Sequence, residues 1–167
     1  MRLSVSTVAV SLAVFLSPGG ASGLPPRAGL VIPGNSLGDL ELGATRAEVR
    51  AAWGARYGVC RDCRAPTWYF NFKPFEPQGV GVTFRKGRAV ALFTMWSPPG
   101  WRTTRGLRIG DPEFRVEAVY GSLFRVGCGR YSALTLPGRG VTTSFYVVDG
   151  QVWGFGLSRG GHATVCR

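Results

Sequence analysis

Histidine is almost absent from this sequence: one residue, His162, stands in the glycine-rich C-terminal stretch "GGHATVC". A hydrolase triad or a histidine general base would have to use it, and the chain contains neither a G-x-S-x-G nor an H-E-x-x-H motif. Acidic residues are also few, nine in 167, and none are paired in the manner of a glycosidase site. The sequence therefore predicts a protein that is not an enzyme and that uses no metal and no cofactor.

The shortage of acidic residues leaves a large positive charge. Twenty basic residues give a formal net charge of +11, and eighteen of them are arginine. A field of this sign favours anionic partners such as nucleic acid, acidic glycopolymers, lipid head groups or an acidic protein face. The same composition also fits a solvated basic surface without a dedicated partner, because net charge alone reports solubility and non-specific attraction.

Long apolar stretches are missing after the first residues. The segment "MRLSVSTVAVSLAVFLSPGGASG" begins with one arginine, continues with an apolar run from Leu3 to Leu16, and ends in small residues. This pattern predicts a secretory signal peptide over residues 1–23, cleaved near Ala21 or Gly23, with an uncleaved anchor as the alternative. We expect an exported protein that is soluble and has no transmembrane segment after signal removal. Because no RNP-like or OB signature is present, nucleic acid is not the expected partner.

Four cysteines suit an oxidising compartment, where an even count favours disulfides. Two of them, Cys60 and Cys63, stand in "CRDC", and the others are Cys128 and Cys166. The simplest pairing is Cys60–Cys63 and Cys128–Cys166. Two alternatives stay open, namely a C-x-x-C redox pair and a zinc site that adds Cys128 and the single histidine.

Residues 42–54, "LGATRAEVRAAWG", carry a helix signature. Thr45 and Glu48 form a T-x-x-E capping box, and Gly54 supplies a glycine stop. One apolar stripe follows at helical spacing, made of Val49, Ala52 and Trp53.

Residues 109–121, "IGDPEFRVEAVYG", repeat this signature with other residues. Here we expect Asp111 as the N-cap, Pro112 at the first helical position and Gly121 as the stop. The corresponding stripe is Val116, Val119 and Tyr120.

Three strands are predicted after each helix. The first set is "TWYFNF", "VGVTFRKG" and "RAVALFTMW", and the second is "YSALTL", "VTTSFYVVDG" and "QVWGFGLS". The last two strands of each set should form a hairpin with glycine at the turn, in "RKGR" and "VDGQ". We therefore predict an α+β fold with two tandem copies of a helix plus a three-to-four-stranded antiparallel unit, the sheets joined side by side with both helices on one face. The boundaries are a signal peptide at 1–23, an irregular lead-in at 24–36, repeat 1 at 37–97, a linker at 98–105 and repeat 2 at 106–167.

The helix cap, R-x-x-V, glycine stop, tryptophan-containing strand and F-x-x-G-x-V hairpin resemble the SmpA/OmlA family of outer-membrane assembly lipoproteins. The tandem arrangement is similar to the β-lactamase inhibitory proteins, and to uncharacterised secreted actinobacterial proteins built on the same unit. The resemblance covers about residues 37 to 160 and implies the fold and one disulfide per copy. The lipobox cysteine is missing, and no binding residue carries over.

The predicted sheet leaves one face open. Strand alternation places Tyr69 and Lys73 on that face, away from the core residues Trp68 and Phe70. Leu92, Trp153 and Phe155 take the core side. The predicted binding residues are Tyr69, Lys73, Arg85, Phe93, Met95 and Tyr146.

A mixture of aromatic side chains with arginine is typical of protein interfaces and of single-strand nucleic-acid platforms. The alternative is that these residues pack against the lead-in or a loop. The predicted function is a secreted, non-catalytic module that binds a protein or an anionic envelope polymer. The alternative function is a small extracytoplasmic enzyme that uses a Cys60/Cys63 redox pair or His162. The sequence predicts no oligomeric state.

Overall fold

We describe the protein from a computed structural model, for residues 28–70, 79–95 and 100–160. In these ranges the chain forms twelve strands, arranged in two sheets, and two short helices. The fold is therefore mostly β. No helix in the described ranges is long and apolar enough to cross a membrane, and the predicted signal segment lies outside them.

The larger sheet has eight strands in the order β4-β5-β6-β7-β12-β11-β10-β9, and every neighbouring pair is antiparallel. Its middle is the β7–β12 pair, in which Leu92 lies opposite Leu157. The strands are β4 (Gly58–Cys60), β5 (Thr67–Phe70), β6 (Gly79–Arg85), β7 (Arg88–Met95), β9 (Phe124–Gly127), β10 (Ser132–Pro137), β11 (Val141–Val148) and β12 (Gln151–Arg159).

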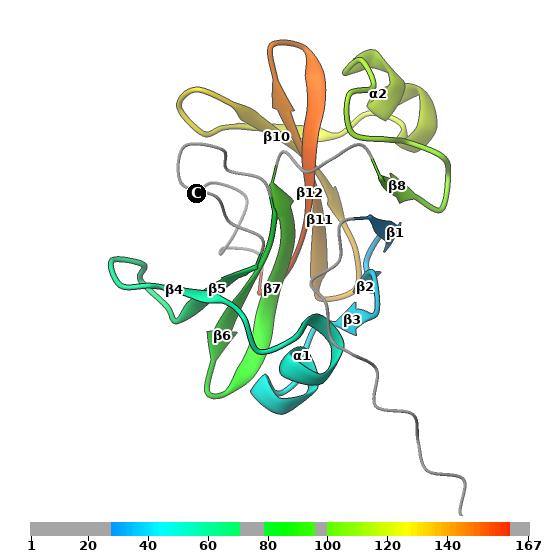
Figure 1. Ribbon diagram of the computed structural model, residues 1–167. Helices are drawn as coiled ribbons and strands as arrows, with labels where there is room; N and C mark the ends of the chain where they lie inside the picture. The colour runs from blue at the N-terminus through cyan, green and yellow to red at the C-terminus, as the bar shows by residue number, and fades with distance from the viewer. Residues whose placement is uncertain (1–27, 71–78, 96–99, 161–167) are drawn as a thin grey trace, which may run out of the picture.

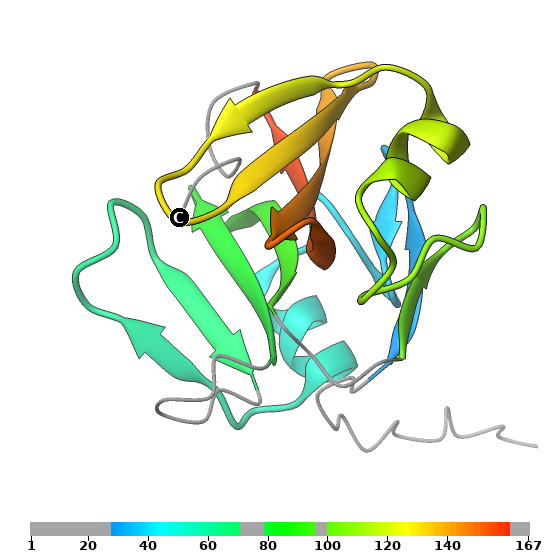
Figure 2. The ribbon, with the colours of Figure 1, turned by 90° about the horizontal axis from the view of Figure 1, so that it is seen from above.

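A second sheet of four short strands has the order β3-β2-β1-β8. Its strands are β1 (Gly29–Ile32), β2 (Ser36–Leu37), β3 (Leu40–Glu41) and β8 (Trp101–Thr103). The β1–β8 pair is parallel and joins segments about seventy residues apart in the sequence. In Figures 1 and 2 this sheet lies on the same side of the larger sheet as α1 (Arg46–Trp53) and α2 (Phe114–Tyr120).

One apolar core joins the larger sheet to this cover. The cover contributes Val31, Val49, Trp53 and Trp101, and the sheet contributes Phe70, Leu134, Phe145 and Leu157, each no more than 1% exposed. The smaller sheet and the two helices together therefore cover the apolar face of the larger sheet.

The predicted α+β tandem of helix-plus-sheet units is wrong. The two helices have only eight and seven residues, and the segments predicted as an irregular lead-in and a linker contain β1 and β8. These segments were hard to recognise because strands of two to four residues with glycine beside them show almost no alternation. They build a second sheet where the prediction had helices alone.

Helix α1 follows its predicted signature. The Thr45 hydroxyl accepts from the Glu48 backbone N–H at 3.2 Å, and the Glu48 carboxylate accepts from the Thr45 N–H at 2.6 Å. Gly54 ends the helix with φ of 88°. The predicted capping box is therefore confirmed, and Val49 and Trp53 are the buried stripe.

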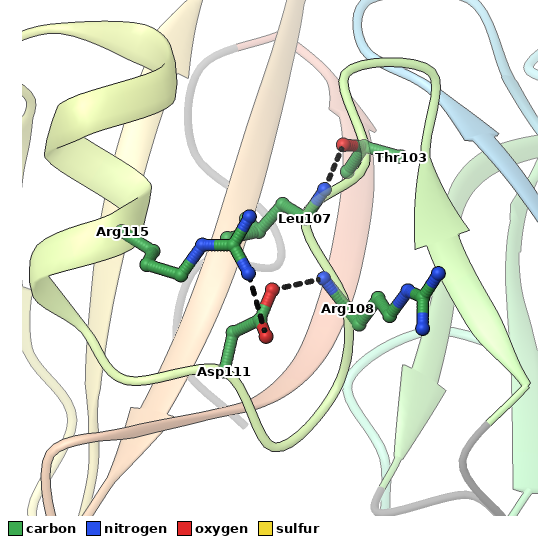
Figure 3. Close-up of polar contacts among 5 residues, drawn as sticks. All are labelled: Thr103, Leu107, Arg108, Asp111 and Arg115. Atoms are coloured by element: carbon green, nitrogen blue, oxygen red, sulfur yellow. Dashed lines mark hydrogen bonds and ion pairs between the residues drawn. The ribbon is translucent and has the colours of Figure 1, made fainter.

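Helix α2 begins later than predicted, because Asp111 is not its N-cap. The Asp111 carboxylate accepts from the backbone N–H of Arg108 at 2.8 Å and pairs with the guanidinium of Arg115 at 3.3 Å (Figure 3). Glu113 occupies the cap position in a helical conformation and makes no side-chain cap. Asp111 instead closes the turn that precedes the helix.

Both predicted hairpins are confirmed. Lys86 and Gly87 have φ of 50° and 76°, and Asp149 and Gly150 have φ of 48° and 74°. Positive φ at both central residues is the type I′ geometry, which matches the twist of the flanking strands.

A β-bulge explains why one predicted core residue lies elsewhere. Tyr146 pairs with Gly154 and Val147 with Val152, so Trp153 is an extra residue on β12. The bulge turns Trp153 to the face opposite the main core, where it packs with Tyr146.

We predict that Thr45→Ala lowers the free energy of unfolding by about 1 kcal/mol, because an N-cap hydroxyl is lost. Urea denaturation measures this, with Thr104→Ala as a control for an exposed threonine.

The hydrogen bond from the Thr45 N–H holds the pKa of Glu48 below its usual 4.5. A lowered folded-state pKa stabilises the fold above the unfolded pKa, so the advantage of wild type over Glu48→Gln should disappear as the pH falls below about 4. An advantage that stays constant down to pH 2 would contradict this.

Candidate functional site

The predicted open sheet face carries a second, smaller core. Phe93 and Tyr146 are 0% and 2% exposed, and the half-buried Tyr69 meets the Phe93 ring edge-on at 5.8 Å. Around them pack Ala133, Cys128, Tyr131 and Trp153. Phe93 and Tyr146 therefore have no surface to offer a ligand in this structure, and of the three only Tyr69 is partly accessible.

Glycines on neighbouring strands explain this burial. A Cβ at Gly81 would overlap the Phe93 ring, and one at Gly156 would lie 2.5 Å from the Tyr146 hydroxyl oxygen. Each aromatic ring therefore lies flat across a strand that has no side chain there. Large side chains on this face are folded down rather than directed outward.

The remaining predicted site residues separate into two groups. Arg85 is exposed at the end of β6. Lys73 and the Met95 side chain lie outside the described residues, as does His162. Of the described site residues, Tyr69, Phe93 and Tyr146 pack together, and Arg85 is not part of that cluster.

Positive charge gathers elsewhere, where the start of α1 meets the β6–β7 turn. We call this the basic surface, made of Arg46, Arg50, Arg85, Lys86 and Arg88. An isolated bridge pairs Thr45 with Arg88, and the Ala89 N–H donates to the Ala44 carbonyl at 2.8 Å. Figures 1 and 2 both show α1 beside the ends of β6 and β7.

Two arginines of α1 lie over aromatic rings of the sheet. The Arg46 guanidinium carbon is 5.8 Å from the centre of the Trp68 ring and 5.5 Å from that of Phe84. The Arg50 guanidinium carbon is 5.9 Å from the centre of the Trp68 ring, and the Trp68 ring is stacked on the Tyr57 ring with their centroids 3.9 Å apart. Cation–π attraction holds both cations in defined positions while they remain exposed.

Sequence reasoning found only Arg85 of this surface. Two signals were available: the i, i+4 spacing of Arg46 and Arg50 on a predicted helix, and the three basic residues of "RKGR" at a predicted turn. The missing step was the contact between the helix and that turn, which no local pattern contains.

Glu48 is the acidic residue of α1 beside these cations. Its hydrogen bonds with Thr45, and to a lesser degree the charge of Arg88, lower its pKa, so it is ionised at neutral pH. One carboxylate against five cations leaves the basic surface strongly positive.

Next to the basic surface is a cavity of about 760 Å³ between β3, α1 and the sheet. Arg88 donates to the Gly43 carbonyl at 3.2 Å, and Arg159 donates to the Leu42 carbonyl at 3.0 Å. Carboxylates also line it, from Asp39, Glu41 and Glu48. Because charges of both signs meet there, the cavity has no preference for anions, in contrast to the basic surface.

Cys60 and Cys63 form a disulfide, as predicted. The bond removes both sulfurs as thiolate ligands, which overturns the zinc alternative, and no group of three or more potential metal ligands occurs in the described ranges. Cys128 is also disulfide-bonded, and Cys166, its predicted partner, lies outside those ranges.

Comparison with known proteins concerns the fold alone. No family model matches the sequence, and neither does any curated protein. The chain is similar in structure to a DUF4309 family protein, YjgB, from Bacillus subtilis subsp. subtilis str. 168, with 15% identity, a TM-score of 0.55, and coverage of 83% of this chain and 88% of that one. An extracellular protein containing a SCP domain from Bacillus anthracis str. Ames has 12% identity and a TM-score of 0.49 over 71% of this chain and 44% of that one. Identities this low assign no activity.

We predict that Gly81→Ala lowers the free energy of unfolding by about 1–3 kcal/mol, because the new methyl group meets the buried Phe93 ring. The control is Gly58→Ala on β4, whose Cβ would be 4.0 Å from its nearest neighbour and should cost less than about 0.5 kcal/mol. Thermal or urea unfolding measures both. An equal loss of unfolding free energy in Gly81→Ala and Gly58→Ala would show that Phe93 moves freely and that the second core is not tightly packed.

Proposed function

We propose that this protein is an exported, non-catalytic binding module that recognises an anionic polymer of the cell envelope through the basic surface. The observation that carries the proposal is the placement of Arg46 and Arg50 over the Trp68 and Phe84 rings, next to the basic β6–β7 turn. The rings limit the side-chain motion that a ligand would otherwise have to suppress, so less conformational entropy is lost on binding.

Arginine chemistry supports an anionic ligand over a neutral one. A guanidinium presents several N–H donors in a fixed fork and is weakly hydrated, which suits sulfate, phosphate and carboxylate groups. Repeated anionic groups along a polymer match several cations spread over a helix and a turn. An acidic protein partner has the same sign of charge and is the alternative ligand.

Export is supported by the predicted signal segment and by the Cys60–Cys63 disulfide, because disulfides persist mainly in oxidising compartments. The resemblance to SmpA/OmlA-like secreted proteins also implies export, and it stays a prediction. An envelope location also brings the chain to the compartment where acidic glycopolymers occur.

The second candidate function is the redox enzyme, favoured by the presence of a C-x-x-C disulfide. Reactive pairs of this kind have their thiol pKa lowered at a helix N-terminus. Here the disulfide lies between β4 and β5, both antiparallel strands of the larger sheet. This position supports a structural bond that ties the end of β4 to the β4–β5 loop.

We predict saturable binding of heparin, a soluble sulfated polysaccharide, with a binding constant that falls with salt by about one logarithmic unit per logarithm of salt for each neutralised charge. The double variant Arg46→Gln/Arg50→Gln should reduce this slope by about two. The control is Arg130→Gln/Arg139→Gln, which removes the same charge from exposed turns. Calorimetry or fluorescence titration at several salt concentrations measures the slopes.

Equal losses in the two double variants would mean that net charge alone drives the attraction, and would contradict a defined surface. Absence of saturable binding to heparin and to isolated wall polymer would also contradict the proposal. Retained folding of each variant is checked by circular dichroism.

For the disulfide we predict that Cys60→Ser/Cys63→Ser lowers the free energy of unfolding by at most about 2 kcal/mol, the chain-entropy value for so short a loop. Heparin binding should be unchanged. In an insulin-reduction assay, the wild-type protein should not exceed the rate of dithiothreitol alone. A faster wild-type rate that the variant loses would replace this proposal with the redox function.

A further inference from the structure

A second pocket lies between β8 and the loop that leads into α2, in a different part of the fold from the basic surface. Its volume is about 470 Å³, and its lining includes Trp101, Arg102, Arg108 and Asp111. Figure 1 places α1 and α2 at opposite ends of the larger sheet. The pocket lining therefore shares no residue with the basic surface.

Two exposed arginines of the pocket lining stand directly opposite each other on neighbouring segments. Arg102 and Arg108 are partners in an isolated antiparallel bridge, a position in which Cβ atoms lie about 4.5–5.5 Å apart. Like charges at directly opposite positions repel and destabilise the pairing. Neither guanidinium has an acidic partner within the described part of the chain, so nothing there offsets the repulsion.

Asp111 does not neutralise this pair. One of its oxygens accepts from the Arg108 backbone N–H at 2.8 Å, and the other pairs with Arg115 at 3.3 Å. Figure 3 shows the Arg108 side chain directed away from the Asp111 carboxylate. Because Arg115 balances the charge of Asp111, the pocket retains about two positive charges.

Trp101 lines the pocket from the strand that also carries Arg102. Its side chain is 1% exposed, and its indole N–H has no acceptor among the described residues. Gly29 and Gly38 fix the ring: a Cβ on Gly29 would lie 2.6 Å from the indole, and one on Gly38 would lie 3.3 Å from it. The indole therefore lies on the core side of β8, opposite the face that carries Arg102.

We infer that this pocket binds a phosphate group between the guanidinium groups of Arg102 and Arg108. Two cations match the nearly two negative charges of a phosphate monoester at neutral pH, and guanidinium forks pair with its oxygens bidentately. The bound anion also offsets the repulsion across the bridge. The ligand class is a phosphate monoester, and the source is either a small metabolite or the end of an envelope polymer.

Calorimetric titration of the full chain at low salt tests this inference, first with inorganic phosphate. Arg102→Gln and Arg108→Gln should each weaken binding about tenfold to a hundredfold, the effect of one charge-assisted interaction. Arg139→Gln, in the β10–β11 turn, is the matched control and should leave phosphate binding unchanged. With a phosphate monoester as the titrant, affinity should fall as the pH drops through about 6, where the monoester loses its second charge.

A thermal shift measurement adds a readout that misfolding cannot imitate. Without phosphate, Arg102→Gln should melt at the same temperature as wild type or higher, because the repulsion is removed. With phosphate, only wild type and Arg139→Gln should gain stability. A lower melting temperature for Arg102→Gln without ligand, or a phosphate effect equal in all variants, would overturn the inference.

Two organic probes distinguish a phosphate monoester from a phosphodiester. Tighter binding of glycerol 3-phosphate than of dimethyl phosphate supports the monoester pocket, whereas equal binding would overturn the choice of a dianion. Heparin titration of Arg102→Gln should give the wild-type affinity, since the basic surface is intact. If phosphate does not bind but heparin still does, the inference about the pocket is contradicted and the proposed function is unaffected.

Discussion

The whole fold depends on covering one apolar face of a wide sheet. Eight strands about 4.8 Å apart span about 34 Å, whereas helices of eight and seven residues are only about 11–12 Å long. Two such helices leave the middle of the sheet exposed. The β3-β2-β1-β8 sheet supplies the missing cover, and Trp101 and Val31 bring its apolar side chains to the same core as Phe145 and Leu157.

This constraint shows why the sequence predicted six strands of the larger sheet but not the architecture. The strands of the hairpins β6–β7 and β11–β12, their type I′ turns, the α1 capping box and the Cys60–Cys63 bond are local features, and each was recognised within a few residues. Strands β1 and β8 are three or four residues long and pair across about seventy residues of sequence. Nothing local reports such a pairing, so a count of helices and strands gave the wrong fold class.

The candidate site was predicted less well than the fold elements, for two physical reasons. First, strand alternation predicts the face on which a side chain lies but not whether that side chain is buried there. Phe93 and Tyr146 are on the expected face, yet glycines on adjacent strands let their rings lie flat and become buried. Second, a single bulge on β12 reversed Trp153. The arginines of the basic surface lie at a helix start and a turn, where the three-dimensional contact decides which charges become neighbours.

The distribution of acidic residues explains where the positive charge is concentrated. Glu48 is engaged by the α1 cap, Asp111 by the turn before α2, and Glu113 by an ion pair with Arg125 that ties α2 to β9. Each of these carboxylates is engaged by a local partner, and none of the three pairs with Arg46, Arg50, Arg102 or Arg108. Unshielded like charges oppose folding, and the fold tolerates them in two different ways. Aromatic rings stabilise the cations of α1 without a ligand, so that surface is ready for a polymer. The Arg102–Arg108 pair has no such support and gains most from an anion placed between its two guanidinium groups.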